Sequence, residues 1–455
     1  MSGLWGLAPE FIALLGALVA LFADAIVRDG RAAARAGALA AAVAALVAVI
    51  IGPGAELFGG MLVLDETAVF ARVAVLALAG VWLLWVAGRG TAPERSAEAV
   101  ALALFSAVGG MLMVSARDLI VLFISLELST MPAYVLIGYR RGDARGLEGA
   151  LKYFLLSMLT SLVLLYGLSF AYGLAGSTSY AELALGGGGL LRQLAFVFVL
   201  VGLFAKLSAA PFHYWTPDAY AGAPAQSVAF VSTVPKVAGT VALVRLVAAL
   251  APGVDDSTMI LIAAALISML VGNLAAYPQS DIRRLMAYSG VAHTGYILLA
   301  LASGATGGAA AVFYAVAYAI PSMAIMLLAA EEGTSLDDLG GLASRRPAVA
   351  WASVAWLLSL VGIPPMVGFF GKLYLFTSAV QAGLLAPVLV AVAMSVVSAG
   401  YYFKILRSVF FGDRSDPAPA VPSAAAGVSF ALATLAVLAL GVLASPVLRF
   451  LGISF

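Results

Sequence analysis

Long apolar stretches dominate the chain, and short polar connections separate them. A helix that crosses a hydrocarbon core of about 30 Å needs roughly 20 apolar residues. The continuity of the apolar stretches indicates membrane helices rather than strands. Fourteen segments qualify, at residues 5–27, 34–51, 66–88, 97–114, 118–138, 149–173, 190–215, 223–250, 258–276, 284–303, 307–330, 348–381, 384–411 and 424–451. The pattern therefore predicts an all-α polytopic membrane protein with about fourteen transmembrane helices, the first of which is a retained span rather than a cleaved signal peptide.

Two segments contain prolines where a straight helix is hard to continue. The twelfth, 348–381, is too long for one crossing, and Gly362-Ile363-Pro364-Pro365 interrupts it. The seventh, 190–215, runs into Pro211 shortly after Lys206. Proline lacks an amide hydrogen and clashes with the preceding turn, and broken helices at membrane depth persist only where protein or water satisfies the freed backbone groups. We predict that both helices are broken and line an ion site; simple kinks are the alternative.

Composition supports a lipid environment. Of the 455 residues, 63% are hydrophobic and 10% are charged, whereas soluble domains carry about 25% charged residues. The net charge of +1 gives no polybasic attraction to nucleic acid. The absence of cysteine excludes disulfides, iron–sulfur clusters and thiolate zinc sites, and two histidines make a multi-histidine metal or haem centre improbable. The Gly186–Gly189 run lies in a connection and indicates a flexible turn rather than a phosphate-binding loop.

Basic residues are distributed unevenly among the connections. Those after even-numbered segments hold only Arg117 and Arg192. Those after odd-numbered segments hold Arg28, Arg31, Arg35, Arg89, Arg95, Arg140, Arg141, Arg145, Arg283, Arg284, Arg345, Arg346 and Arg414. Because cytoplasmic loops are enriched in Lys and Arg, the odd connections are predicted to be cytoplasmic and both termini extracytoplasmic, in agreement with an even number of helices.

Several ionisable residues lie well inside the apolar segments. Each charge at the bilayer centre costs roughly 2.5–3.5 kcal/mol on insertion scales, so mutual pairing and hydration must offset the cost. The candidates for a proton relay are Glu127, Lys152, Lys206, Lys236, His293, Lys372 and Lys404. Burial moves the proton affinities of lysine and glutamate toward neutral pH, histidine titrates there already, and neighbouring sites couple.

Each candidate also has a structural interpretation. Lys152 and Lys404 can extend toward an interface. His293 can be a hydrogen-bonded core histidine. Glu127, Lys206 and Lys236 can form a structural ion pair.

The spacing of the candidates indicates an internal repeat. Glu127 and His293 are 166 residues apart, as are Lys206 and Lys372, and Lys236 and Lys404 are 168 apart. The offset of five helices is odd, so the second unit enters the membrane in the opposite direction, as in inverted-topology repeats. We therefore divide the chain into N-terminal helices 1–3 (residues 1–96), a first repeat of helices 4–8 (97–250), an inverted repeat of helices 9–13 (251–411) and a C-terminal helix (412–455).

Several motifs resemble a known family. Pro211-Phe212-His213-Tyr214-Trp215-Thr216-Pro217-Asp218-Ala219-Tyr220, with Gly222-Ala223-Pro224 and Pro235-Lys236 after it, resembles the signature of the antiporter-like membrane subunits of respiratory complex I. The stretches Leu285–Tyr296 and Gly149–Phe154 resemble the subunit N type of bacterial NADH-quinone oxidoreductase, called subunit 2 in mitochondria. The resemblance covers nearly the whole chain.

This resemblance implies proton translocation in the bacterial inner membrane, coupled to electron transfer in other subunits. It implies a Glu127–Lys206 pair, with Lys236 as central relay, His293 as bridge, Lys372 at the exit and Lys152 near the entrance. His213 and Asp218 are secondary candidates, and Ala221 stands where relatives usually carry an acidic residue. The chain is expected to hold no cofactor, whereas FMN, iron–sulfur clusters, NADH and quinone belong to partner subunits. M-type and K-type membrane subunits are the expected neighbours.

Two alternatives remain open from the sequence. A subunit of a multisubunit cation/proton antiporter shares the fold, and a non-transporting scaffold would carry the same charges for structural reasons.

Overall fold

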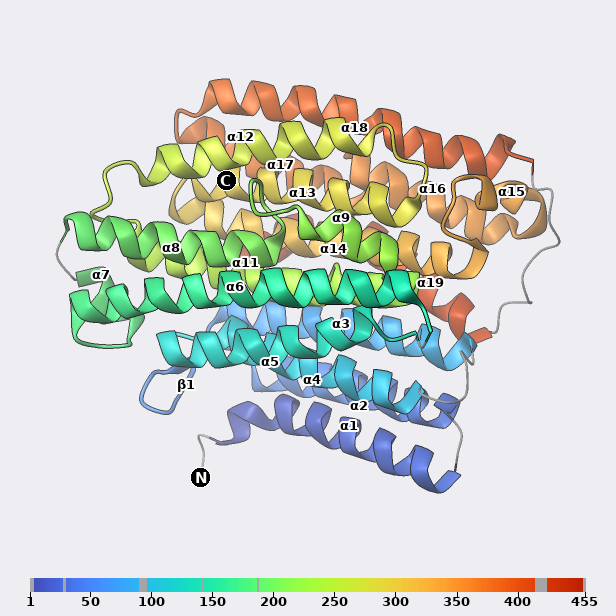
Figure 1. Cartoon of the computed structure of the whole chain (residues 1–455), viewed down its shortest axis with the longest axis horizontal. Helices are drawn as coiled ribbons and strands as arrows, with labels where there is room; N and C mark the ends of the chain where they lie inside the picture. Colours follow the sequence, from blue (N-terminus) through green and yellow to red (C-terminus); the bar gives the residue numbers. More distant parts are fainter. Residues whose placement is uncertain are drawn as a thin grey trace.

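The computed structural model consists almost entirely of helices that run side by side, with one short hairpin (Figure 1). It describes residues 4–27, 30–89, 96–140, 142–185, 188–413 and 424–452; Arg28, Arg95, Arg141, Arg414 and the first half of the Gly186–Gly189 run lie outside these ranges. Within them, twelve helical segments are long and apolar enough to cross a membrane. The predicted all-α class is confirmed, while the total of fourteen crossings stays a prediction.

The N-terminal part forms one edge of the bundle. It contains a 3-10 turn (Leu4–Leu7), α1 (Ala8–Val27), α2 (Gly30–Ile51), the antiparallel hairpin β1 (Ala55–Leu57) and β2 (Leu62–Leu64), and α3 (Glu66–Arg89). Arg72 of α3, which is fully buried, forms an ion pair with Glu10 of α1 and donates a hydrogen bond to the Gly6 carbonyl at 2.8 Å. This pair holds α1 against α3, and no local pattern in the sequence reveals it.

The middle of the chain follows on. It comprises α4 (Ser96–Ser115), α5 (Leu119–Ile137), α6 (Ala144–Ala175), α7 (Tyr180–Leu185), α8 (Leu190–Leu207), α9 (Trp215–Gly222), α10 (Ala225–Val231) and α11 (Val234–Leu250). Aspartates start two of these helices: Asp118 accepts hydrogen bonds from the first amides of α5, and Asp143 does the same for α6. A carboxylate at this position satisfies amides that have no partner within the helix.

The remaining elements form the opposite edge of the bundle and part of its centre. They are α12 (Ser257–Ala276), α13 (Ile282–Leu301), α14 (Ala305–Glu332), a 3-10 turn (Asp337–Leu339), α15 (Leu342–Arg345), α16 (Pro347–Val361), α17 (Val367–Gln381), α18 (Leu385–Phe411), α19 (Ala424–Val442) and α20 (Ala444–Phe450). Helix α14 is enclosed by neighbours along its whole apolar length. The last predicted segment, 424–451, is divided at Leu443 rather than continuous.

Matching details occur in the two regions assigned to repeats. Asp118 caps α5 and bridges to Ser179, and Asp281 caps α13 and bridges to Ser335. A methyl group on Gly109 of α4 would lie 2.4 Å from the Ser129 amide of α5. The same group on Gly272 of α12 would lie 2.4 Å from the Ala292 amide of α13. Two helix pairs therefore pack through a glycine at similar places, while the repeat itself stays a prediction.

The seventh and twelfth predicted segments are both interrupted. The seventh ends at Leu207, before Pro211, because Ser208 adopts a left-handed conformation with a φ of 63°. The twelfth is divided into α16 and α17, and Gly362, with a φ of 96°, ends α16. Both breaks contain a cis peptide bond, at Ala210-Pro211 and Pro364-Pro365.

A third break was missed by sequence reasoning. The predicted segment 223–250 is present as one span, Ala225–Leu250, but its helix is interrupted between Val231, where α10 ends, and Val234, where α11 begins. Pro235 in the first turn of α11 has no amide hydrogen to continue the ladder. The hydroxyl of Thr233 instead donates to the Ala229 carbonyl at 2.7 Å. The break therefore lies directly before Lys236.

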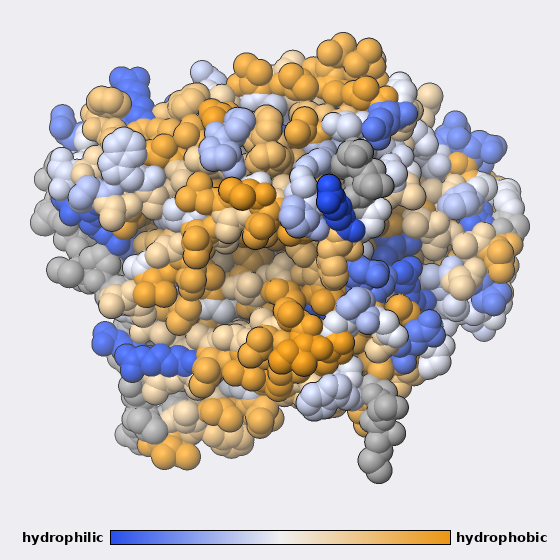
Figure 2. Space-filling model, turned by 180° about the vertical axis from the view of Figure 1, so that it is seen from behind, coloured by the Kyte–Doolittle hydropathy of each residue, from blue (hydrophilic) through white to orange (hydrophobic). Residues whose placement is uncertain are grey.

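The surface agrees with a membrane location. Figure 2 shows apolar side chains over much of the middle of one face, with hydrophilic side chains largely toward its two ends. The helices run between these ends. An apolar band of this kind is what a helix bundle presents to lipid.

Candidate functional site

The first group of buried charges lies where α5, α6 and α8 meet. The Glu127 side chain is 11% exposed and the Lys206 side chain 6%, and 3.4 Å separates Lys206 Nζ from Glu127 Oε1. The hydroxyl of Ser161 donates to the same carboxylate oxygen at 2.6 Å. The structure thus brings the two residues into the contact that the sequence predicts, and attraction between opposite charges offsets part of the cost of burying them.

Hydroxyl groups surround the Lys206 ammonium. It donates to Ser157 Oγ at 2.7 Å and to Tyr134 OH at 3.2 Å, and Tyr134 donates to Ser157 at 2.8 Å. Lys206 also lies in the last turn of α8, where the free carbonyls of a helix end favour a positive charge. The break at Ser208 therefore positions the lysine beside the glutamate. Sequence reasoning missed Tyr134 and Ser157, because single hydroxyl residues in apolar helices are common.

Lys236 faces a small cavity between α11, α13 and α14. The cavity has a volume of about 20 Å³ and is lined by Leu207, Ser232, Lys236, Thr240, Gly290, His293, Thr294, Ile297, Ala315, Tyr318 and Ala319. One water molecule needs about 10–15 Å³ on this measure, so the cavity can hold a water beside the lysine. Thr294 donates to the carbonyl of Leu207, the neighbour of Lys206, at 2.8 Å, which joins this cavity to the first group.

His293 is held by two tyrosines. Its Nδ1 lies 2.7 Å from Tyr314 OH and its Nε2 lies 3.1 Å from Tyr402 OH. The imidazole ring also packs on Tyr318, with 4.2 Å between ring centroids. These tyrosines come from α14 and α18 and were not found from the sequence, because the chain has many tyrosines and their spacing carries no signal.

Lys372 belongs to α17 and extends its ammonium to the break between α16 and α17. Its ammonium donates to the carbonyls of Leu360 and Val361 at 3.0 and 2.8 Å, and to Ser395 Oγ at 2.7 Å. Pro364 and Pro365 end the amide ladder there, so the lysine satisfies carbonyls left without partners at the end of α16. An open cavity of about 440 Å³ reaches this lysine between α17 and α18.

The other predicted residues lie toward the ends of the helices. Lys152, whose side chain is 44% exposed, pairs with Glu148 at 2.8 Å and with Asp218 at 3.3 Å. Asp218 also pairs with Arg284 at 3.1 Å. His213 lies partly buried in the connection between α8 and α9.

Lys404 also lies toward the end of its helix. It donates to the Tyr277 carbonyl at 2.8 Å and to the Gln279 carbonyl at 3.4 Å. These carbonyls follow the end of α12, where a cation is favourable. The structure does not bring Lys152 or Lys404 into contact with the buried chain of Glu127, Lys206, Lys236, His293 and Lys372.

A further ionic group lies at one end of the bundle. Asp65 accepts hydrogen bonds from Arg117 at 2.6 Å and from both terminal nitrogens of Arg245 at 2.8 and 2.9 Å. Burial raises the pKa of Asp65, but the charge and hydrogen bonds of Arg245, the Ala68 amide and the charge of Arg117 together hold it below its usual value. Sequence reasoning missed this group because its members are distant in the chain.

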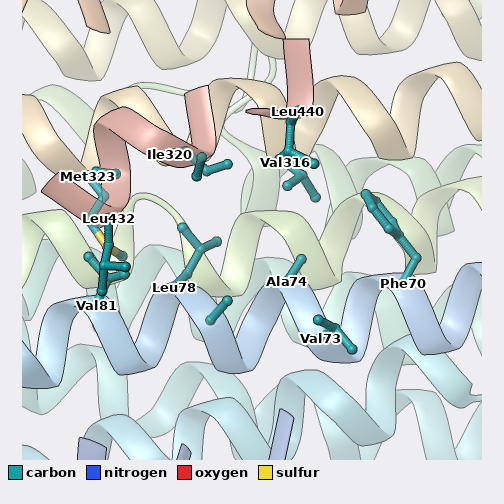
Figure 3. Close-up of a pocket in the computed structure, with 13 residues that line it drawn as sticks. Phe70, Val73, Ala74, Leu78, Val81, Val316, Ile320, Met323, Leu432 and Leu440 are labelled. Carbon is teal, nitrogen blue, oxygen red and sulfur yellow. The ribbon is translucent and has the colours of Figure 1, made fainter. Parts of the chain in front are cut away.

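An apolar groove between α3, α14 and α19 is separate from the charges (Figure 3). It has a volume of about 190 Å³, and Phe70, Val81, Ile320, Met323 and Leu440 are among its lining residues, none of which is ionisable. Among the described residues, no group of three or more His, Cys, Asp or Glu side chains is arranged to hold a metal ion. The candidate site is thus the buried line of ionisable residues.

Comparison with known proteins places this architecture in a family. Residues 116–398 match the family described as NADH:quinone oxidoreductase/Mrp antiporter, transmembrane. The chain belongs to this family. A curated relative, NADH-quinone oxidoreductase subunit N of Rhizorhabdus wittichii, is 38% identical over 97% of this chain and 95% of its own length.

Solved structures agree in fold. A chain of respiratory complex I from Thermus thermophilus is 33% identical, with a TM-score of 0.85 over 97% of this chain and 98% of its own. A chain of the Mrp complex from Dietzia sp. DQ12-45-1b has a TM-score of 0.83 over 98% of this chain and 96% of its own. Its identity of 23% means that it supports the fold alone. The protein is therefore an antiporter-like multi-pass membrane subunit.

Proposed function

We propose that this chain is the proton-translocating subunit N of a bacterial inner-membrane NADH-quinone oxidoreductase. The observation that carries the proposal is the buried pairing of Glu127 with Lys206, continued by Lys236, His293 and Lys372. A pair of buried charges is often no more stable than apolar packing, so a line of five ionisable groups indicates a function beyond stability. The identity of 38% with a subunit N over nearly the whole chain supports this assignment over an Mrp antiporter subunit.

In this proposal the groups are loaded and emptied in turn. A proton that arrives at Glu127 neutralises the carboxylate and weakens its attraction to the Lys206 ammonium. The ammonium then shifts toward its hydroxyl neighbours and toward the water-sized cavity beside Lys236. The resulting change of charge alters the proton affinity of Lys236 and, through His293, of Lys372, because buried neighbouring sites titrate as a coupled set. Lys372 releases its proton through the open cavity beside α17.

Electron transfer occurs in other subunits in this proposal. FMN, iron–sulfur clusters, NADH and quinone belong to them, and M-type and K-type membrane subunits lie beside this chain. Both termini face away from the cytoplasm. Lys152, Asp218 and Arg284 form a surface network near the entrance, and Lys404 stabilises the end of α12.

Purification through a tag on this chain tests the assignment. We expect flavin- and iron–sulfur-containing proteins to co-purify, and the isolated complex to reduce quinone with NADH. Vesicles containing the complex should then acidify in their lumen during NADH oxidation. Co-purification of a cation/proton antiporter complex without redox proteins would contradict the proposal and favour the Mrp class.

A further inference from the structure

A continuous chain of buried hydroxyl and imidazole groups crosses the centre of the molecule. Tyr318 OH lies 3.4 Å from Ser289 Oγ, which lies 2.6 Å from Tyr402 OH. Tyr402 OH lies 3.1 Å from His293 Nε2, and His293 Nδ1 lies 2.7 Å from Tyr314 OH. All five side chains are buried, and they come from α13, α14 and α18.

The chain begins beside Lys236. A methyl group on Gly290 would lie 2.9 Å from Lys236 Nζ and 3.4 Å from Tyr318 OH. The amine and the phenol therefore flank the same glycine, and both line the water-sized cavity described above. Because position 290 has no side chain, nothing from α13 separates Lys236 from Tyr318 at this point.

The chain ends beside Lys372. The ring of Tyr314 packs against Gly371, where a methyl group would lie 2.7 Å from its Cδ2. The Lys372 ammonium lies 5.4 Å from the centre of the Tyr296 ring, and the rings of Tyr296 and Tyr314 lie 6.3 Å apart. The ring of Tyr314, the last member of the chain, is therefore adjacent to Gly371, the residue that precedes Lys372.

We propose that Tyr318, Ser289, Tyr402, His293 and Tyr314 form a proton wire between the cavity of Lys236 and the site of Lys372. The inference rests on the proposed function and adds four residues to it. Every group in the wire can both donate and accept a hydrogen bond, which is the property that proton transfer along a chain requires.

The transfer step conserves protons and charge. A proton from the Lys236 ammonium, relayed by a water in the cavity, forms a new O–H bond on Tyr318 as the original phenolic proton moves to Ser289. Ser289 passes its own proton to Tyr402, and Tyr402 passes its proton to Nε2 of His293. The imidazole releases the proton of Nδ1 to Tyr314, whose phenolic proton moves on toward Lys372. One proton enters, one leaves, and the groups then rotate back.

A neighbouring tyrosine outside the wire serves as a control for the structural effect of losing a buried hydroxyl. Tyr401, which adjoins Tyr402 on α18, is equally buried, and its hydroxyl donates to Asn273 Oδ1 at 3.1 Å. Its ring packs against that of Tyr402, with 4.5 Å between the ring centroids, but none of the links from Tyr318 through Ser289, Tyr402 and His293 to Tyr314 passes through the Tyr401 hydroxyl. It therefore offers a matched control, because Tyr401→Phe removes the same atom from the same helix.

The test compares proton pumping with electron transfer in the reconstituted complex. Tyr402→Phe and Ser289→Ala should each lower protons pumped per electron at least about tenfold, because a positioned proton-transfer group contributes on the order of 10²–10⁴ in rate and water restores only part of it. Tyr401→Phe should pump as the wild type does. Electron transfer to quinone with an uncoupler present should persist in all three.

The outcomes separate the wire from the proposed function. If Tyr402→Phe and Ser289→Ala pump as well as Tyr401→Phe while Lys236→Ala is defective, the wire is wrong and the lysine relay stands. If Lys236→Ala also pumps normally, the proposed function itself fails. Should Tyr402→Phe prevent assembly, Ser289→Ala, which removes a single small hydroxyl, decides the question.

Discussion

At the scale of single residues, the pairing of Glu127 with Lys206 can be tested by a single substitution. Glu127→Gln keeps the shape of the side chain and removes its charge. A hydrogen bond to a charged group contributes about 1.5–3 kcal/mol, so the substitution removes much of the attraction that holds the Lys206 ammonium beside position 127. We therefore expect proton pumping to fall much more than electron transfer from NADH to an artificial acceptor, measured in the same vesicles. An equal loss of both would indicate failed assembly instead.

The Asp65 group gives a pH-dependent prediction. Its pKa in the folded protein lies below the value of about 3.9 in an unfolded chain. Its contribution to stability is therefore present above that value and is lost as the pH falls through the folded pKa. Asp65→Asn should lower stability at pH 7 by about 1.5–3 kcal/mol and flatten the further loss below pH ~4.

Thermal unfolding of the detergent-solubilised complex across this pH range measures the effect. Asp256→Asn is the matched control, because Asp256 is exposed and its side chain makes no capping hydrogen bond. If the stability of Asp65→Asn depends on pH as that of the wild type does, the contacts of Asp65 with the two arginines do not contribute to the stability of the fold.

At the scale of helices, close packing between α4 and α5 depends on Gly109. A methyl group there would lie 2.4 Å from the Ser129 amide and 2.7 Å from the Leu128 carbonyl carbon, both backbone atoms that cannot move alone. Gly109→Ala should destabilise the protein by about 1–3 kcal/mol or more. Gly173→Ala in α6 has nothing within 4 Å and should be neutral or slightly stabilising. Thermal stability of the two variants tests this, and equal stabilities would contradict the packing.

The helices also show what a sequence can and cannot reveal. The lengths of the apolar segments predicted all twelve of the membrane-length helices found among the described residues, and the prolines predicted the breaks after Lys206 and before Lys372. Pro235 gave the same signal before Lys236, yet an uninterrupted apolar run concealed that break. Side-chain partners such as Ser157 for Lys206 and Tyr402 for His293 come from other helices, and no local pattern identifies them.

The repeat predicted from the sequence takes another register when the helices are compared. Sequence spacing paired Glu127 with His293 at a separation of 166 residues. The aspartate caps and the two packing glycines of α4 and α12 instead have separations of 163 residues, which aligns Glu127 with Gly290. His293 is then one helical turn farther along its helix. In that register a glycine of α13 corresponds to the glutamate of α5, and both Lys236 and Tyr318 lie beside this glycine.

At the scale of the whole molecule, the buried groups form a line through the centre of an apolar bundle. The Glu127–Lys206 pair is connected through Leu207 and Thr294 to the cavity of Lys236, and His293 lies between that cavity and Lys372. Ionisable side chains at membrane depth are costly and usually mark a pathway for ions or protons. The central claim is that protons move along this line.

Replacement of Lys236 in the reconstituted complex tests that claim most directly. Lys236→Ala removes the one lysine among the described residues that line the cavity beside His293. Arg407→Ala, which removes an exposed cation near the end of α18, is the control. The measurement is protons pumped per electron during NADH oxidation, read from a pH-sensitive dye in the vesicle lumen. The account predicts that Lys236→Ala abolishes most pumping while uncoupled electron transfer continues and Arg407→Ala pumps normally. Normal pumping by Lys236→Ala would contradict it.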